Sequence, residues 1–148
     1  MTETLKSLAD EVRRRKAEDD QMAQHIFLSF YAIQFSTAFD PEVKGTFNTV
    51  SQSEASKALE YILKEGPSLV VFTILQTDNL ESIKPVGSNI QELFNYRIAL
   101  QMSENESFKI VGSSLASQIY DMKRPSSKFR AYCRDKVRNT DIKFKPYN

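Results

Sequence analysis

The sequence predicts an α/β fold, specifically a three-layer domain with a mostly parallel sheet. Two nearly continuous apolar runs, 25–33 and 69–75, are typical of strands covered on both faces, as strands of parallel sheets are. A helical pattern lies between them, and strands that alternate with helices favour crossover connections and parallel pairing. A third apolar run occupies 96–102. The chain has 148 residues, which fits a single domain over 1–148.

Two helices are predicted with clear boundaries. The N-terminal segment, 1–24, is expected to form a surface helix with a charged, solvated run at Arg13–Lys16, because its apolar residues recur at helical spacing: Leu5, Leu8, Ala9 and Val12. A second helix is expected before residue 66. Ser51 or Ser53 can cap its start, and Gly66-Pro67 ends it.

The remaining elements are shorter. The segment 35–52 reads as an irregular connector, and short helices are expected over 88–94 and 103–111. Near the C-terminus, "FRAYCRD" and "TDIKFKPY" alternate in the manner of strands and are joined by a short polar turn. This pattern predicts a C-terminal β-hairpin at one edge of the sheet.

Composition excludes several classes of function. Net charge is +1, so the chain as a whole has no strong basic field for nucleic acid. The single cysteine, Cys133, and the lack of a long apolar run favour a cytoplasmic protein without a membrane span. His25 is the only histidine, and no zinc spacing, nucleophile elbow or phosphate-binding glycine loop is present. No catalytic residue and no metal ligand are therefore predicted.

Polar side chains follow the first two strands. Gln34 follows the first, and Gln76, Thr77 and Asp78 follow the second. If these strands are parallel neighbours, the side chains meet at the carboxyl edge of the sheet, where ligands bind in α/β folds. A glutamine there can orient water or sense a phosphate, and an aspartate can hold hydrated magnesium. The alternative is ordinary turn chemistry, for which Asp78-Asn79 is a good pair.

Several motifs together resemble the C-terminal half of FtsK/SpoIIIE-type (FtsK–HerA) ATPase motors. They are "ALEYILKEGPSLVVFTILQTDN", "LFNYRIALQMSENES" and "FKPY". In that family a helix ends in Gly-Pro, a strand runs into a polar sensor position that is often Gln, and an arginine-bearing strand precedes a serine. The matching positions are Gly66-Pro67, Gln76, Arg97, Ser103 and Ser107.

The resemblance implies a partial RecA-like P-loop NTPase core over 25–148, in a family that uses ATP and Mg²⁺. The resemblance implies that Gln76 is the remnant of a sensor residue. It implies that Arg97 contacts either the nucleotide of a neighbouring subunit or a partner within its own sheet. The sequence departs from the family in two places. Walker A is absent, and the Walker B acids would fall near Tyr31 and Ala32. Hydrolysis by this chain alone, or a cofactor held by it alone, is therefore not expected.

We therefore expect a fragment or degenerate copy of an FtsK-like ATP-dependent DNA-translocase motor domain. It would act by packing against a parent domain or a second copy, as a homo-oligomer that could exchange the N-terminal helix. The basic residues of the C-terminal third could also contact a nucleic-acid backbone. These residues are Lys123, Arg124, Lys128, Arg130, Arg134, Lys136 and Arg138. Two alternatives remain: an unrelated α/β protein-interaction module without nucleotide, and a small enzyme using 34–52 and Asp78.

Overall fold

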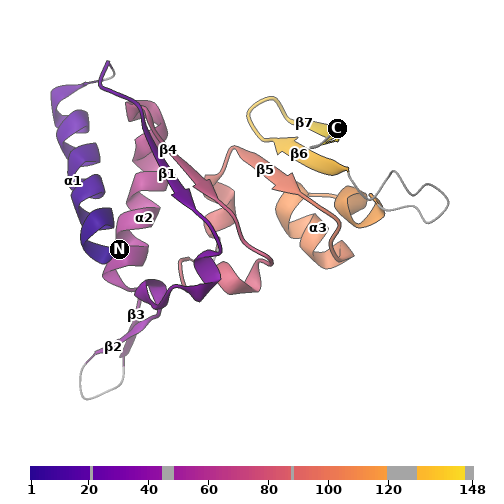
Figure 1. Ribbon diagram of the computed structural model, residues 1–148, viewed down its shortest axis with the longest axis horizontal. Helices are drawn as coiled ribbons and strands as arrows, with labels where there is room; N and C mark the ends of the chain where they lie inside the picture. Colours follow the sequence, from indigo (N-terminus) through magenta and orange to yellow (C-terminus); the bar gives the residue numbers. More distant parts are fainter. Residues whose placement is uncertain (21, 45–48, 88, 120–129, 146–148) are drawn as a thin grey trace. The chain divides into compact units, whose positions relative to one another are not determined.

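The computed structural model describes the chain apart from residues 21, 45–48, 88, 120–129 and 146–148 (Figure 1). It is an α/β structure with three α-helices and three small sheets among the described residues. Contacts within the chain group it into two compact units, residues 1–93 (unit 1) and 94–148 (unit 2), where the sequence predicts one domain.

Unit 1 is built on two helices that pack side by side, α1 (Thr2–Glu18) and α2 (Glu54–Glu65) (Figure 1). The predicted apolar stripe of α1 faces this contact, with Leu5, Ala9 and Val12 buried. The helix is shorter than the predicted 1–24, because Asp19 adopts a left-handed conformation (φ 51°) that ends it.

Arg15 corrects the expectation of a solvated Arg13–Lys16 run. Its side chain is on the buried side of α1, and the residue is only 3% exposed. The guanidinium donates from Nη1 to Leu69 O at 3.0 Å and from Nε to Glu11 Oε1 at 2.8 Å. The neighbouring Arg13, Arg14 and Lys16 are exposed, as predicted.

Helix α2 begins and ends where the sequence indicates. Ser53 caps it by accepting a hydrogen bond from the Ser56 N–H at 3.2 Å. At its other end, the 3₁₀ turn η3 (Gly66–Leu69) carries the chain into the next strand. A Cβ added at Gly66 would lie 2.8 Å from Val71 O, so the close approach of turn and strand requires glycine here.

The central prediction about the strands is confirmed. β1 (Ile26–Phe30) and β4 (Val71–Leu75) form a parallel pair, with Ile26 opposite Val71 and Phe30 opposite Leu75. The Gln76 N–H extends the ladder by donating to Phe30 O at 2.9 Å. The carboxyl ends of the two strands therefore lie side by side.

Only one face of this pair is covered by described residues. Phe30 and Val71 are buried on the side where α2 packs against β4. On the opposite face, Phe27 is 66% exposed and Ile74 is 58% exposed. The expected burial on both faces is wrong for these strands, because apolar sequence alone does not supply a second covering layer.

Short elements complete unit 1. The 3₁₀ turns η1 (Ile33–Phe35) and η2 (Thr37–Phe39) follow β1, and β2 (Glu42–Lys44) pairs antiparallel with β3 (Thr49–Ser51) in the segment predicted to be irregular. After β4 come η4 (Glu81–Ile83) and η5 (Ile90–Leu93).

Unit 2 contains a three-stranded antiparallel sheet in the order β5 (Tyr96–Ala99), β6 (Ala131–Asp135), β7 (Thr140–Phe144). Its β6–β7 hairpin confirms the C-terminal prediction. Helix α3 (Glu104–Val111) and the 3₁₀ turn η6 (Ser114–Gln118) pack against each other. The small core of the unit consists of Ala99, Val111, Ala116 and Ile119.

The prediction of one mostly parallel sheet is therefore wrong for the described residues. β5 was expected to join β1 and β4, but it pairs antiparallel with β6, a hairpin strand that runs in the opposite direction. The only parallel ladder among the described residues is β1–β4.

Candidate functional site at the ends of the parallel strands

The candidate site lies where β1 and β4 end. After β1, Ala32 adopts a left-handed conformation (φ 53°) and turns the chain into η1, which carries Gln34. After β4, the chain passes through Gln76, Thr77 and Asp78 to η4. η1 and η4 contact each other, so the two post-strand segments meet in one region of unit 1.

Gln34 is half-buried, and its Oε1 atom is fully buried without a hydrogen-bond partner among the described residues. The Oγ1 atom of Thr73, within β4, is in the same state. A buried acceptor left without a donor costs on the order of 1–3 kcal/mol. Gln76, in contrast, is exposed.

Thr77 and Asp78 take part in a local turn. The Thr77 hydroxyl donates to Asn79 O at 2.9 Å, and Asp78 Oδ1 accepts from Asn79 Nδ2 and Ser82 Oγ, both at 3.1 Å. Asn79 Oδ1 also accepts from the Ser82 N–H at 2.9 Å. These contacts fit the turn interpretation of both residues.

Arg97, the remaining predicted site residue, belongs to unit 2. It lies on β5 and donates from Nη1 to Ile110 O at 3.0 Å and from Nε to Phe94 O at 3.3 Å. Ile110 is in the last turn of α3, where carbonyls lack helical partners and favour a cation. Arg97 therefore ties β5 to the end of α3.

The two serines of the same motif also organise α3. Ser103 and Glu106 form a capping box at its start. Ser107 is completely buried; its hydroxyl donates to Ser113 O at 2.5 Å and accepts from the Ala116 N–H at 3.0 Å. The three residues of this motif, Arg97, Ser103 and Ser107, thus form hydrogen bonds that stabilise unit 2.

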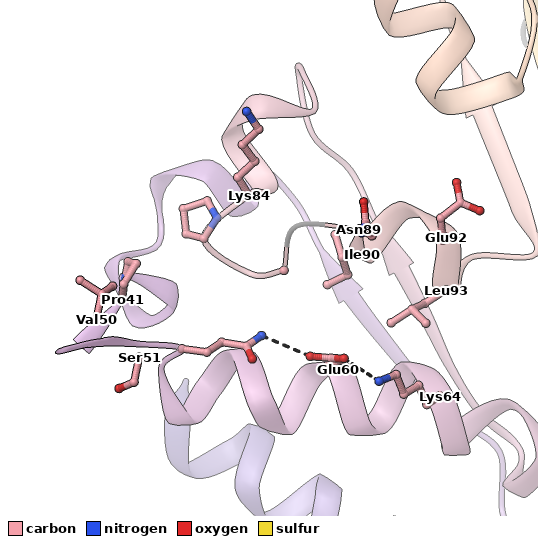
Figure 2. Close-up of a pocket in the computed structure, with 13 residues that line it drawn as sticks. Pro41, Val50, Ser51, Glu60, Lys64, Lys84, Asn89, Ile90, Glu92 and Leu93 are labelled. Carbon is pink, nitrogen blue, oxygen red and sulfur yellow. Dashed lines mark hydrogen bonds and ion pairs between the residues drawn. The ribbon is translucent and has the colours of Figure 1, made fainter. Parts of the chain in front are cut away.

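A cleft of about 560 Å³ in unit 1 was not predicted from the sequence (Figure 2). Glu60 is central to its polar lining, accepting from Lys64 Nζ at 2.6 Å and from Gln52 Nε2 at 3.3 Å. These two hydrogen bonds lower the pKa of Glu60. Gln52 also donates to Val86 O at 2.8 Å. The Glu60–Lys64 spacing of four residues was the available signal, but such pairs are common on exposed helix faces.

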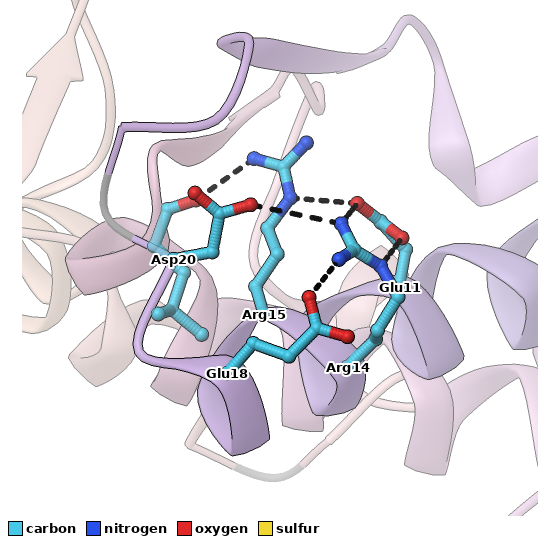
Figure 3. A network of polar contacts seen from close by, with 6 residues as sticks. Glu11, Arg14, Arg15, Glu18 and Asp20 are labelled. Carbon is cyan, nitrogen blue, oxygen red and sulfur yellow. Dashed lines mark hydrogen bonds and ion pairs between the residues drawn. The ribbon is translucent and has the colours of Figure 1, made fainter.

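A network of charges surrounds the end of α1 (Figure 3). Glu11 accepts from Arg14 and Arg15 at 2.8 Å, and Arg14 also pairs with Glu18 and, at 3.8 Å, with Asp20. The hydrogen bonds from Arg14 and Arg15 lower the pKa of Glu11 to about 2. Every charge in this network has a partner within α1 or just after it, which indicates a structural role.

The basic residues of the C-terminal third are partly engaged. Arg134 pairs with Asp141 at 3.2 Å and donates to Asn139, and Arg138 lies 3.9 Å from Asp135. Arg130 and Lys136 are exposed. Lys123, Arg124 and Lys128, also named for a backbone contact, lie outside the described residues.

Two further findings concern cofactors and membranes. Across the residues that the structure describes, no group of three or more His, Cys, Asp or Glu side chains is arranged to hold a metal ion. In that same part of the chain, no helix combines the length and apolar character needed to cross a bilayer.

Comparisons of the chain with family models, curated proteins and solved structures found no match.

Proposed function

We propose that the chain is a non-hydrolysing module of an FtsK-like, ATP-dependent DNA-translocating motor. The observation that carries the proposal is the parallel β1–β4 pair, whose carboxyl ends lie side by side and lead into Gln34 and Gln76. A nucleotide-handling α/β sheet requires this arrangement, because its ligands sit at the carboxyl ends of parallel strands. Antiparallel or distant strands would have excluded the proposal.

The Gly66-Pro67 motif supports the same proposal in physical terms. Glycine is needed because turn η3 approaches β4 so closely. That approach sets where β4 begins, and five residues later the strand delivers Gln76 to the edge of the sheet. The close approach at Gly66 therefore links α2, the Gly-Pro turn, β4 and Gln76 geometrically. These elements follow one another in the same order as in the motor family.

The residues present do not fit a complete Mg²⁺–ATP site. No glycine-rich loop wraps the phosphates, and Tyr31 and Ala32 stand where an acidic pair would hold the metal and the attacking water. The phosphate-binding loop must then come from another domain. The exposed Gln76 side chain would add a polar contact to a nucleotide held there, whereas the Oε1 atom of Gln34 is buried.

The interaction-module alternative is favoured by one observation, the exposed apolar side chains of the β1–β4 and β5–β6–β7 sheets. The two functions make different demands on Gln76. A motor module needs its side chain for nucleotide-dependent activity, whereas a nucleotide-free interaction module does not.

The test supplies the missing phosphate-binding loop. The same gene or its neighbours should encode a G-x-x-x-x-G-K-[ST] sequence, and ATP turnover by that protein is measured with and without this chain. We expect this chain alone to show no turnover and its addition to raise turnover. Gln76→Ala should reduce the stimulation by about tenfold, which is the loss expected for one polar contact to the reacting phosphate.

Gln24→Ala is the matched control, because Gln24 is also exposed but precedes β1, at the opposite end of the strands. It should leave the stimulation unchanged. Turnover by the chain alone, no stimulation, or equal effects of the two substitutions would each contradict the proposal.

A further inference from the structure

Each unit has a sheet face on which large apolar side chains are exposed. In unit 1, Phe27 and Phe72 lie opposite each other on β1 and β4 with ring centroids 5.4 Å apart, and Ile74 follows on the same face. We call these three residues the outer face of unit 1. Its remaining position, Ser29, is uncharged, so a partner that placed a charge here would bury it without a counter-ion.

We call the exposed residues Tyr96, Ile98 and Ile142 the outer face of unit 2; Ala131 and Asp135 of the central strand β6 lie on the same side but are buried. Ile98, Cys133 and Ile142 are in register across β5, β6 and β7, so they point to the same side of the sheet. The opposite side carries Ala99 and Tyr132, which pack with α3. Tyr96, Ile98 and Ile142 are 61%, 64% and 52% exposed.

The two units carry opposite net charges. Unit 1 has nine Lys and Arg against fourteen Asp and Glu, a net charge of −5; unit 2 has eleven against five, a net charge of +6. The overall charge of +1 conceals this separation. Opposite charges attract the unlike units of two molecules and repel the like units, which favours head-to-tail over head-to-head association.

We propose that the outer face of unit 1 docks onto the outer face of unit 2 of a second copy of this chain. Apolar side chains form the centre of this contact, and the opposite net charges of the two units attract each other. Because the two surfaces differ, the association is heterologous and adds copies in sequence, closing into a ring or continuing as an open chain. This inference does not depend on the proposed motor function.

The size of the faces sets the expected strength. Three large side chains, more than half exposed in most cases, present on the order of 300 Å² of apolar surface on each face. With a polar rim, the contact buries about 1,000 Å² in total, at the lower limit for a specific interface. Association should therefore be weak, dependent on concentration and weakened by salt.

Light scattering and sedimentation velocity on the whole chain test the proposal. The wild-type mass should rise above that of the 17.0 kDa monomer as protein concentration increases, and fall again between about 0.05 M and about 0.5 M NaCl. Phe27→Ser and Ile98→Ser should each weaken association by at least about tenfold. Val43→Ser and Val137→Ser remove equally exposed valines outside both faces and should leave association unchanged.

Mixing the two variants separates head-to-tail docking from other geometries. Phe27→Ser keeps an intact unit 2 face and Ile98→Ser an intact unit 1 face, so an equimolar mixture should form a 1:1 dimer that grows no further. Circular dichroism melting must show that both variants are folded. A wild-type monomer at every concentration, association that persists in Phe27→Ser, or a mixture that stays monomeric would overturn the proposal.

Discussion

At the scale of single residues, some buried polar side chains have partners that are distant in the sequence. Arg15 is the clearest case, because it sits among exposed charges in the sequence but is buried between α1 and η3. Its partners are a carboxylate one turn away and a carbonyl 54 residues away. Only the near partner is visible in the sequence.

Arg15→Ala should lower the free energy of unfolding by about 2–3 kcal/mol, because Leu69 O and Glu11 lose a buried, charged donor. Arg13→Ala is the control. It loses an exposed contact to Asp10 and a cation–π contact with Tyr61, at a cost of about 1 kcal/mol or less. Urea denaturation of both variants measures the difference, and equal losses would mean that Arg15 is not held as described.

The lowered pKa of Glu11 predicts that the stability of the folded chain decreases at acid pH. Its pKa is about 2 in the folded chain against an ordinary value of 4.5, so the ionised form is favoured by folding. Its contribution is complete above about pH 4.5 and is lost as the pH falls toward 2. Thermal melting between these values should fall less steeply for Glu11→Gln than for wild type; parallel curves would contradict this.

At the scale of elements, the sequence predicts those helices and strands whose formation depends on local sequence patterns. Both helices, the end of α2 at Gly66, and the parallel neighbours β1 and β4 follow from apolar spacing, caps and crossover connections, whereas the end of α1 at Asp19 does not. The pairing of β5 does not, since its apolar run is the same whether its neighbour is β4 or β6. A ladder partner more than thirty residues away decides the direction of the sheet.

The candidate site divides in the same way. Gln34 and Gln76 both come after neighbouring strands, as the sequence predicts, but β1 ends at Phe30 and not at Ile33, so Gln34 lies in the turn η1. The sequence offered turn chemistry at Asp78-Asn79 as the alternative, which the contacts of Thr77 and Asp78 fit, but it did not indicate the contact with Ser82. Nor could it indicate the cleft beside Glu60, whose walls come from segments far apart in the sequence: β3, α2 and residues 84–93.

The α3 capping box gives an element-scale prediction. Ser103→Ala removes the acceptor for the Glu106 N–H and should destabilise unit 2 by about 1 kcal/mol. Ser7→Ala, an exposed position in the middle of α1, should be neutral or slightly stabilising because alanine favours helix. Amide hydrogen exchange localises the effect: faster exchange should appear in 104–111, and unchanged exchange there would contradict the role of the cap.

At the scale of the whole molecule, two small cores take the place of one large one. Unit 1 is organised by the α1–α2 contact and the parallel pair, and unit 2 by α3 against an antiparallel sheet. Each unit also has exposed large apolar side chains on its main sheet. The proposed docking between copies would cover these side chains.

The unequal sharing of acidic and basic residues also has a practical consequence at the bench. A protein with a sequence pI near 7.8 would ordinarily pass through an anion exchanger at neutral pH. This one carries an acidic half and a basic half, so at low ionic strength both anion and cation exchangers should retain it. A preparation eluted from either resin should become less soluble as the salt is dialysed away.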